Sequence, residues 1–306
     1  MASREDQSCL EVAVKMPFEM AGPIRAVLRT FVPSLVWRKE RPESGLCLLK
    51  TEMVMDDRID HSLSEIEEAL QKFEAKHALS EPLPVGLRVM EADEPMGALR
   101  RQLRPGRVSP RLTIGPPGAS LPTGQREQVL LIEPQDAFGD GNHPSTRLAL
   151  LLLDELLSGK YGSPAKGQGW VLDAGCGSGV LALAAAALGE YKALAVDLDP
   201  RAIYAARGNL RHNPGPGSKI SLALGDLSCA RGPFWLVLAN LVPPVHPRVW
   251  HTLWDAVEPG GWLILSGFCE TQKDSILSPY FQKGATEKAL SVDKAWAGSL
   301  LHKPER

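Results

Sequence analysis

The sequence predicts an α/β protein in which a small α+β domain precedes a Rossmann-like domain built on a mostly parallel sheet. Residues 11–90 contain segments in the order β-α-β-β-α-β, the split βαβ pattern of ferredoxin-like domains. From residue 129 onward, short apolar strands alternate with helical segments, which is typical of a parallel sheet covered by helices on both faces. A glycine-rich segment joins one of these strands to the following helix.

The clearest helix of the first half covers residues 62–77. Ser62 and Glu65 have the spacing of a capping box, and Ile66, Leu70 and Phe73 form one apolar stripe. The other elements expected in this half are a helix at 22–31, which begins near a proline, and strands at 11–16, 35–39, 46–55 and 85–90.

A connector rich in proline, glycine and arginine covers residues 91–128 and contains one expected strand at 111–114. We therefore predict a first domain at 1–95, a linker at 96–106 and a second domain at 107–306. The strands expected in the second domain are 129–132, 170–172, 193–196, 222–224, 234–239 and 261–266, and the helices are 146–157, 180–188, 200–213 and 247–257.

Composition narrows the class of protein. The 306 residues are 44% hydrophobic and 23% charged, and the formal net charge of −2 gives no electrostatic reason to expect tight nucleic-acid binding. The start of the chain is acidic and lacks the apolar core of a signal peptide, so we expect a protein in the cytoplasm with no membrane attachment. We also expect a monomer. The five cysteines form no C-x-x-C pair, so neither a metal site nor a disulfide framework is predicted.

The strongest functional signal is the segment 171–179 (VLDAGCGSG). Its glycines have the spacing G-x-G-x-G, whereas a helix N-terminus that binds a dinucleotide pyrophosphate has G-x-G-x-x-G. S-adenosylmethionine has no phosphate, and it needs close backbone approach together with a carboxylate for its ammonium or hydroxyl groups. Asp173 is predicted to face the ammonium, whereas Cys176 is interpreted as a small packing residue.

Polar residues at the ends of the next strands extend this signal. Asp197 ends the following strand and can accept hydrogen bonds from both ribose hydroxyls. Asp199 is interpreted as a helix N-cap. Asp226 fits an adenine contact and a turn aspartate equally well, and Asn240 ends a further strand. Because ligands of open α/β sheets bind at the carboxyl ends of strands, we expect these side chains to share one site.

Residues 137–146 (AFGDGNHPST) resemble the A-F-G-T-G-T-H-P-T-T loop of the PrmA family, bacterial enzymes that methylate amines of ribosomal protein L11. The resemblance continues through 173–179, 197–203 (DLDPRAI), 239–241 (ANL) and 258–267, and it spans about residues 107–285. It implies a class I S-adenosylmethionine-dependent N-methyltransferase with a seven-stranded sheet. The implied acceptor is a lysine or amino group of a protein, a large-subunit ribosomal protein, which the N-terminal domain would hold.

The resemblance also implies roles for individual residues. Thr146, Gly175, Asp197 and Asn240 match the cofactor-contacting positions, and the loop 138–143 would fold over the cofactor. The predicted catalytic residues are Asn240, which would orient the amine, and His143, the candidate base. The full set of predicted cofactor contacts is Phe138, Gly139, Thr146, Asp173, Gly175, Gly177, Gly179, Asp197, Leu198, Asp226 and Asn240.

Asp140 and Asn142 stand where the family has threonines, and Trp235 stands where it usually has an acidic residue. Three alternatives to a ribosomal-protein methyltransferase therefore stay open: a methyltransferase with a small-molecule or other protein acceptor, a cofactor-binding adaptor without activity, and a nicotinamide-dependent oxidoreductase. The G-x-G-x-G spacing disfavours the last of these, and the intact glycines, Asp197 and Asn240 argue against lost activity.

Overall fold

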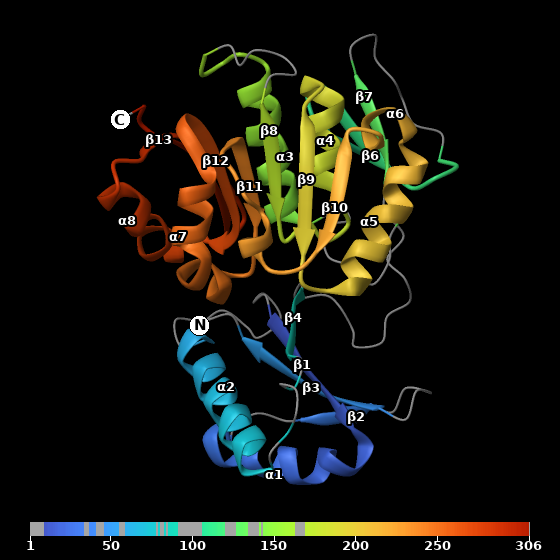
Figure 1. Ribbon diagram of the computed structural model, residues 1–306, viewed down its shortest axis with the longest axis vertical. Coiled ribbons are helices and arrows are strands. Elements are labelled where there is room, and N and C mark those ends of the chain that lie inside the picture. Colours follow the sequence, from blue (N-terminus) through green and yellow to red (C-terminus); the bar gives the residue numbers. More distant parts are fainter. Residues whose placement is uncertain are drawn as a thin grey trace. The chain divides into compact units, whose positions relative to one another are not determined.

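The structure is a computed structural model (Figure 1) that describes residues 9–33, 37–40, 46–54, 59–77, 79, 83, 85–90, 106–119, 127–133, 141, 143–162 and 169–305. The chain divides into two compact units, Met1–Ala98 and Leu99–Arg306.

The first unit has the predicted split βαβ order. Its elements are β1 (Cys9–Pro17), α1 (Ala21–Phe31), β2 (Arg38–Glu40), β3 (Leu46–Val54), α2 (Ile59–Lys76) and β4 (Val85–Met90). The strands form an antiparallel sheet in the order β2-β3-β1-β4.

Alternation along β1 decides which side of this sheet is buried. Val12 and Val14 are fully buried, whereas Lys15 is exposed and Ala13 is half-buried. The predicted stripe on α2 is buried as well, but the predicted capping box is wrong, because the helix begins at Ile59 and so contains Ser62. The apolar side chain of Ile59, itself buried, extends the helix by a further turn.

The second unit is a seven-stranded sheet in the order β10-β9-β8-β11-β12-β14-β13, with only β14 antiparallel to its neighbours. The strands are β8 (Trp170–Ala174), β9 (Lys192–Asp197), β10 (Ile220–Leu224), β11 (Phe234–Asn240), β12 (Val257–Cys269), β13 (Thr286–Asp293) and β14 (Trp296–His302). The helices are α3 (Pro144–Leu157), α4 (Val180–Gly189), α5 (Pro200–His212), the short α6 (Pro214–Gly217), α7 (His246–Ala256) and α8 (Lys273–Gln282).

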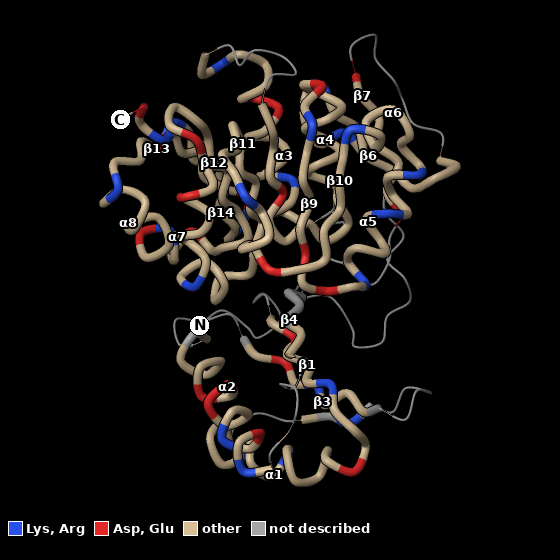
Figure 2. Tube along the Cα trace, viewed as in Figure 1, with Lys and Arg blue, Asp and Glu red and all other residues tan. Residues whose placement is uncertain are grey.

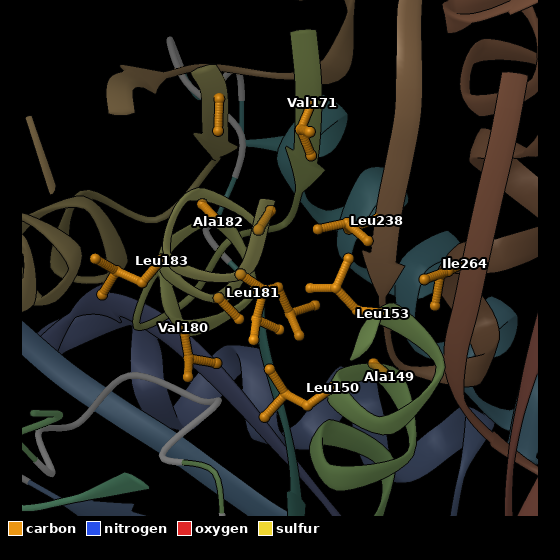
Figure 3. Close-up of a cluster of buried hydrophobic side chains, with 14 of the residues drawn as sticks. Ala149, Leu150, Leu153, Val171, Val180, Leu181, Ala182, Leu183, Leu238 and Ile264 are labelled. Carbon is orange, nitrogen blue, oxygen red and sulfur yellow. The ribbon is translucent and has the colours of Figure 1, made fainter. Parts of the chain in front are cut away.

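Helices cover both faces of this sheet, as the buried apolar strands predict. On β11, Leu236 and Leu238 pack with α3 and α4, whereas Val237 and Ala239 face α7 and α8. Figure 3 shows Leu238 of β11 close to Leu153 of α3. The core is therefore continuous through the sheet, and this rigid support holds the strand ends that carry the polar residues.

Parts of the second unit differ from the sequence-based expectation, and helix α8 was not predicted. The strand expected at 129–132 is β7 (Gln128–Leu131), which pairs with β6 (Leu112–Gly115). On its other side β6 pairs with β5 (Gly106–Ser109), so these strands form a separate three-stranded sheet in the order β5-β6-β7. Strands β13 and β14 were not predicted. β13 alternates half-buried with exposed residues at the sheet edge and so lacks a continuous apolar run, whereas β14 is a buried interior strand that was overlooked.

Acidic and basic residues are both scattered over the second unit (Figure 2), although α4 contains neither kind. Over the residues that the structure describes, no helix combines the length and the apolar character needed to cross a bilayer.

Candidate active site

The glycine-rich turn between β8 and α4 lies at the carboxyl end of the sheet. Gly175, Gly177 and Gly179 have φ angles of 71°, 51° and 78°, which favour glycine over residues with a Cβ atom. The N–H groups of Gly175 and Cys176 donate to the carbonyl of Val196 on β9, so the turn is held against the neighbouring strand. Burial raises the pKa of the Cys176 thiol, which agrees with a packing role.

Asp173 lies near the end of β8, and its side chain is buried at 1% exposure. Oδ2 accepts a hydrogen bond from the N–H of Ala182 at 3.0 Å, in the first turn of α4. Oδ1 is buried and has no hydrogen-bond partner among the described residues. Burial, together with a smaller effect of the Asp197 charge, raises the pKa of Asp173 to about 8. A cation at Oδ1 would relieve both effects.

We expect the raised pKa of Asp173 to make folding stability depend on pH. Between about pH 4 and 8 the folded protein retains a proton that the unfolded chain has lost, so stability falls as the pH rises. The slope is about 1.4 kcal/mol per pH unit for one proton. Asp173→Asn should remove this slope, as measured by denaturant unfolding at several pH values.

The control for this prediction is Asp274→Asn, at an exposed position of α8. It should follow the pH dependence of the unmodified protein. Equal slopes for Asp173→Asn and the unmodified protein would contradict the assignment of the proton to Asp173.

Asp197, at the end of β9, is half-buried, and each of its oxygens accepts one backbone hydrogen bond. Oδ2 accepts from the N–H of Gly177 at 2.9 Å, and Oδ1 accepts from the N–H of Asp199 at 2.9 Å. A carboxylate has about four lone-pair positions, so each oxygen can accept a further hydrogen bond from a ligand. Burial raises the pKa of Asp197. The turn thus fixes the carboxylate to the glycine backbone.

The two residues after Asp197 differ in role: Asp199 caps a helix, and Leu198 exposes an apolar side chain. Asp199 is the N-cap of α5, as predicted, because its side chain accepts from the N–H of Arg201 at 2.8 Å. Leu198 is 73% exposed, an unusually open position for a large apolar side chain at a strand end. An exposed leucine next to this carboxylate suits a flat ring such as adenine, and both contacts stay predictions.

Asp226 follows β10 and is exposed. Its side chain accepts from the N–H of Ser228 at 2.7 Å and caps the short 3-10 turn Leu227–Cys229. Hydrogen bonds from Ser228 lower its pKa. Asp226 is therefore a turn aspartate, as one of the two interpretations had it, and its contact with adenine stays a prediction.

Asn240 ends β11 and lies beside the first turn of α3. Its Nδ2 donates to Oγ1 of Thr146 at 3.1 Å, and Thr146 is fully buried. The Oδ1 atom of Asn240 is also buried but has no hydrogen-bond partner in the described part of the chain. Buried acceptors are nearly always satisfied, so this atom indicates a missing donor. The amine of an acceptor substrate is such a donor.

His143 precedes α3 as its N-cap and is 3% exposed. Its Nδ1 accepts from the N–H of Ser145 at 3.2 Å and lies 2.7 Å from the hydroxyl of Ser145. The imidazole packs edge-on against Trp296 of β14, with ring centroids 4.6 Å apart. This geometry gives His143 a capping and packing role, and its role as a base stays a prediction.

The predicted residues Phe138 and Gly139 lie outside the described residues, as do Asp140 and Asn142. Within the residues that the structure describes, no group of three or more histidine, cysteine or acidic side chains is arranged to hold a metal ion.

The sequence analysis missed two buried residues that surround Asn240. His246 and Ser266 lie beneath the strand end, where the imidazole Nε2 is 3.1 Å from the backbone carbonyl of Ser266. One sequence feature could have indicated His246. The dipeptide His-Pro at the start of α7 repeats the arrangement of His143 and Pro144 at the start of α3.

The strand order brings the predicted residues together. Strands β10, β9, β8 and β11 are consecutive neighbours, so Asp226, Asp197, Asp173 and Asn240 follow one another along the same edge of the sheet. Two carboxyl groups with raised pKa values favour a cationic ligand, and two buried oxygens have no donor among the residues that the structure describes. S-adenosylmethionine fits this set, because it carries a sulfonium, an ammonium and ribose hydroxyls.

Comparison with known proteins assigns the chain to a family. Residues 46–303 match the sequence model of the family described as ribosomal protein L11 methyltransferase (PrmA). A ribosomal protein L11 methyltransferase of Geobacter metallireducens is 29% identical over 242 residues, which cover 79% of this chain and 77% of the relative. One from Sorangium cellulosum is 34% identical over 220 residues, which cover 72% of this chain and 67% of the relative.

Among solved structures, a ribosomal protein L11 methylase from Lactobacillus delbrueckii subsp. bulgaricus is similar to this chain, with a TM-score of 0.57 and 26% identity. The match covers 65% of this chain and 98% of that protein. The likeness confirms the fold class that the sequence predicts.

Proposed function

Because this chain belongs to the PrmA family of S-adenosylmethionine-dependent methyltransferases, we propose that it methylates amino groups of a ribosomal protein, and that L11 is this protein. Relatives in several bacteria are named for that activity. The observation that carries the proposal is the buried Oδ1 of Asn240, which accepts from no donor in the described part of the chain and lies at the edge of the sheet that also carries Asp197 and Asp173.

An amine acceptor must lose a proton before it can attack a methyl group. An ordinary lysine has a pKa near 10.4, so at pH 7 its neutral form is disfavoured by about 4.6 kcal/mol. A neutral amide oxygen suits this need better than a carboxylate, because it accepts from the amine and, without a negative charge, stabilises the ammonium form less. Asn240 would therefore orient the neutral amine, with its own amide held in place by Thr146.

The cofactor, when bound, supplies an electrophilic methyl group on a sulfonium. This chain's residues would hold it across the strand ends: Asp197 would accept the ribose hydroxyls, Leu198 would pack on the adenine, and Asp173 would face the ammonium. The supporting observations are the remaining acceptor capacity of Asp197, the exposure of Leu198 and the unpartnered Oδ1 of Asp173. The tight glycine backbone leaves room for close approach.

We include the first unit in the proposal as the part that holds the acceptor protein. Along β1, one side of its sheet is buried, whereas Lys15 on the other side is exposed. A protein acceptor bound there should shield Lys15 from acetylation, as measured by mass spectrometry with and without the acceptor. A ribosomal-protein acceptor also implies a cytoplasmic reaction, and a monomeric state stays a prediction.

The decisive experiment is transfer of a deuterated methyl group from the cofactor to purified, unmethylated ribosomal protein L11, followed by mass spectrometry of its peptides. The same assay with a ribosome-free lysate, separated into protein and low-mass fractions, tests the alternatives. Label on L11 amines, lost in Asn240→Ala, would support the proposal. Label found only in the low-mass fraction, or only on another protein, would show that L11 is not the acceptor.

For His143→Ala we expect a pH profile of methyl transfer with the same shape as that of the unmodified enzyme. The reason is that the His143 side chain is buried and its Nδ1 serves the helix cap. Loss of the cap should lower the free energy of unfolding by about 1 kcal/mol. Disappearance of an acid limb of the profile in this variant would instead establish His143 as the base.

A further inference from the structure

His246 is a buried polar residue that has no part in the function argued so far. It begins α7, and its side chain is 1% exposed. The chain leaves β11 at Asn240, passes through the 3-10 turn Pro243–Val245 and returns at His246 to the place it left. The imidazole Nε2 lies 3.1 Å from the carbonyl oxygen of Leu241 and 3.1 Å from that of Ser266.

These contacts define the state of the ring. Both neighbours of Nε2 are carbonyl oxygens, which only accept, so Nε2 must carry the proton and donate to them. Burial lowers the pKa of His246 to about 4, so the ring is neutral near pH 7. Phe268 packs edge-on against it with ring centroids 5.6 Å apart. The ring therefore has one donor in a defined position.

The two carbonyl groups belong to the segments that hold Asn240. Leu241 is the next residue along the chain, and Ser266 is the partner of Asn240 in the parallel pairing of β11 with β12. The N–H of Leu241 also donates to the carbonyl of Ser266 at 3.1 Å. His246 thus closes a small ring of hydrogen bonds directly behind the strand end that carries the Asn240 side chain.

We propose that His246 is a positioning residue for methyl transfer: its Nε2–H fastens the end of β11 to β12 and so fixes the direction of the Asn240 amide. This inference rests on the proposed role of Asn240. The Nδ1 atom supports it, because it is buried without a hydrogen-bond partner among the described residues. An unsatisfied buried acceptor lowers stability, and a leucine of similar volume would avoid that cost. Histidine at this place is therefore explained by its donor rather than by packing.

The test uses three substitutions that separate the donor from the volume. His246→Gln places an N–H near the position of Nε2, His246→Asn places one nearer the position of Nδ1, and His246→Leu removes the donor. We expect kcat to fall about fivefold in the leucine and asparagine variants and to stay within twofold in the glutamine variant. The Kd for S-adenosylmethionine and the unfolding midpoint should change little in His246→Leu. His251→Leu, an exposed position of the same helix, is the control.

A kcat of His246→Leu equal to that of the unmodified enzyme, or equal losses in the glutamine and asparagine variants, would overturn the proposal. A second readout is independent of activity: hydrogen exchange at the Leu241 amide should accelerate in the leucine and asparagine variants and stay slow with glutamine. If the unmodified enzyme does not methylate L11, the proposed function fails, while the exchange data still decide whether His246 fastens the strand end. Unchanged exchange in His246→Leu would overturn the proposal even in an active enzyme.

Discussion

Replacement of Asp197 by alanine is expected to weaken the binding of S-adenosylmethionine about 100-fold. Each carboxylate oxygen already accepts one backbone N–H, from Gly177 and Asp199, so the group is oriented before the ligand arrives. A hydrogen bond to a charged group contributes about 1.5 kcal/mol or more, and two of them to the ribose amount to about 3 kcal/mol. That free energy corresponds to about two powers of ten in Kd. Isothermal titration measures the change.

The matched control for this prediction is Asp199→Ala. Asp199 is the neighbouring carboxylate but is used by the cap of α5 and by the Arg201 guanidinium. Its removal should change the Kd for the cofactor by less than threefold. If a folded Asp197→Ala protein binds as tightly as Asp199→Ala, the ribose is held elsewhere and the orientation proposed for the cofactor is wrong.

The second large effect is expected at Asn240. Asn240→Ala should lower turnover by tenfold or more and affect cofactor binding much less. The side chain supplies a buried acceptor at the strand end, and Thr146 fixes the amide so that Oδ1 is the atom left over. Without it, the amine loses the contact that aligns its lone pair with the methyl group, and misalignment of the reacting atoms is costly. Steady-state kinetics together with titration of the cofactor separate the two effects.

Asn240→Asp provides a sharper comparison, because it keeps the shape and adds a charge. A carboxylate beside the amine raises the pKa of the ammonium, so the neutral form becomes scarcer at pH 7. We therefore expect slow transfer that recovers as the pH rises. Asn213→Ala is the control for removing a buried asparagine, since its hydrogen bonds among the described residues go to Leu131 of β7 and Asn209 of α5 and not to the seven-stranded sheet. Near-normal turnover of Asn240→Ala with intact cofactor binding would exclude the proposed role.

The sequence was sufficient for the local features of the site. The glycine spacing between β8 and α4 predicted the turn, because three positive φ angles in five residues need glycine. Asp199 was identified as a cap because an aspartate before a proline at a helix start has one common use. Asp197 and Asn240 were found because a polar residue that ends a buried strand is conspicuous in an apolar run. Each of these signals is contained in a few consecutive residues, so the local backbone geometry decides the structure there.

The sequence could not assign partners that meet only through the fold. Asp173 was expected to face the ammonium, but the burial and raised pKa of its carboxyl group follow from α4 and β9 packing around it. Nothing local indicates that Thr146 binds Asn240, which is 94 residues away, or that His246 binds the carbonyl of Ser266. The edge strand β13 was not predicted for a related reason. A strand at an exposed sheet edge can form without an apolar run, so its sequence carries no strong signal.

By itself, therefore, the sequence determined the class of fold, the kind of cofactor and the edge of the sheet that carries the predicted cofactor residues. It could do so because glycine spacing and strand periodicity act through the local backbone. Only the tertiary structure decided which polar atoms are satisfied and which are left for a ligand. Hydrogen-bond satisfaction depends on groups that distant segments bring together, and the same packing sets the desolvation that shifts the pKa of Asp173.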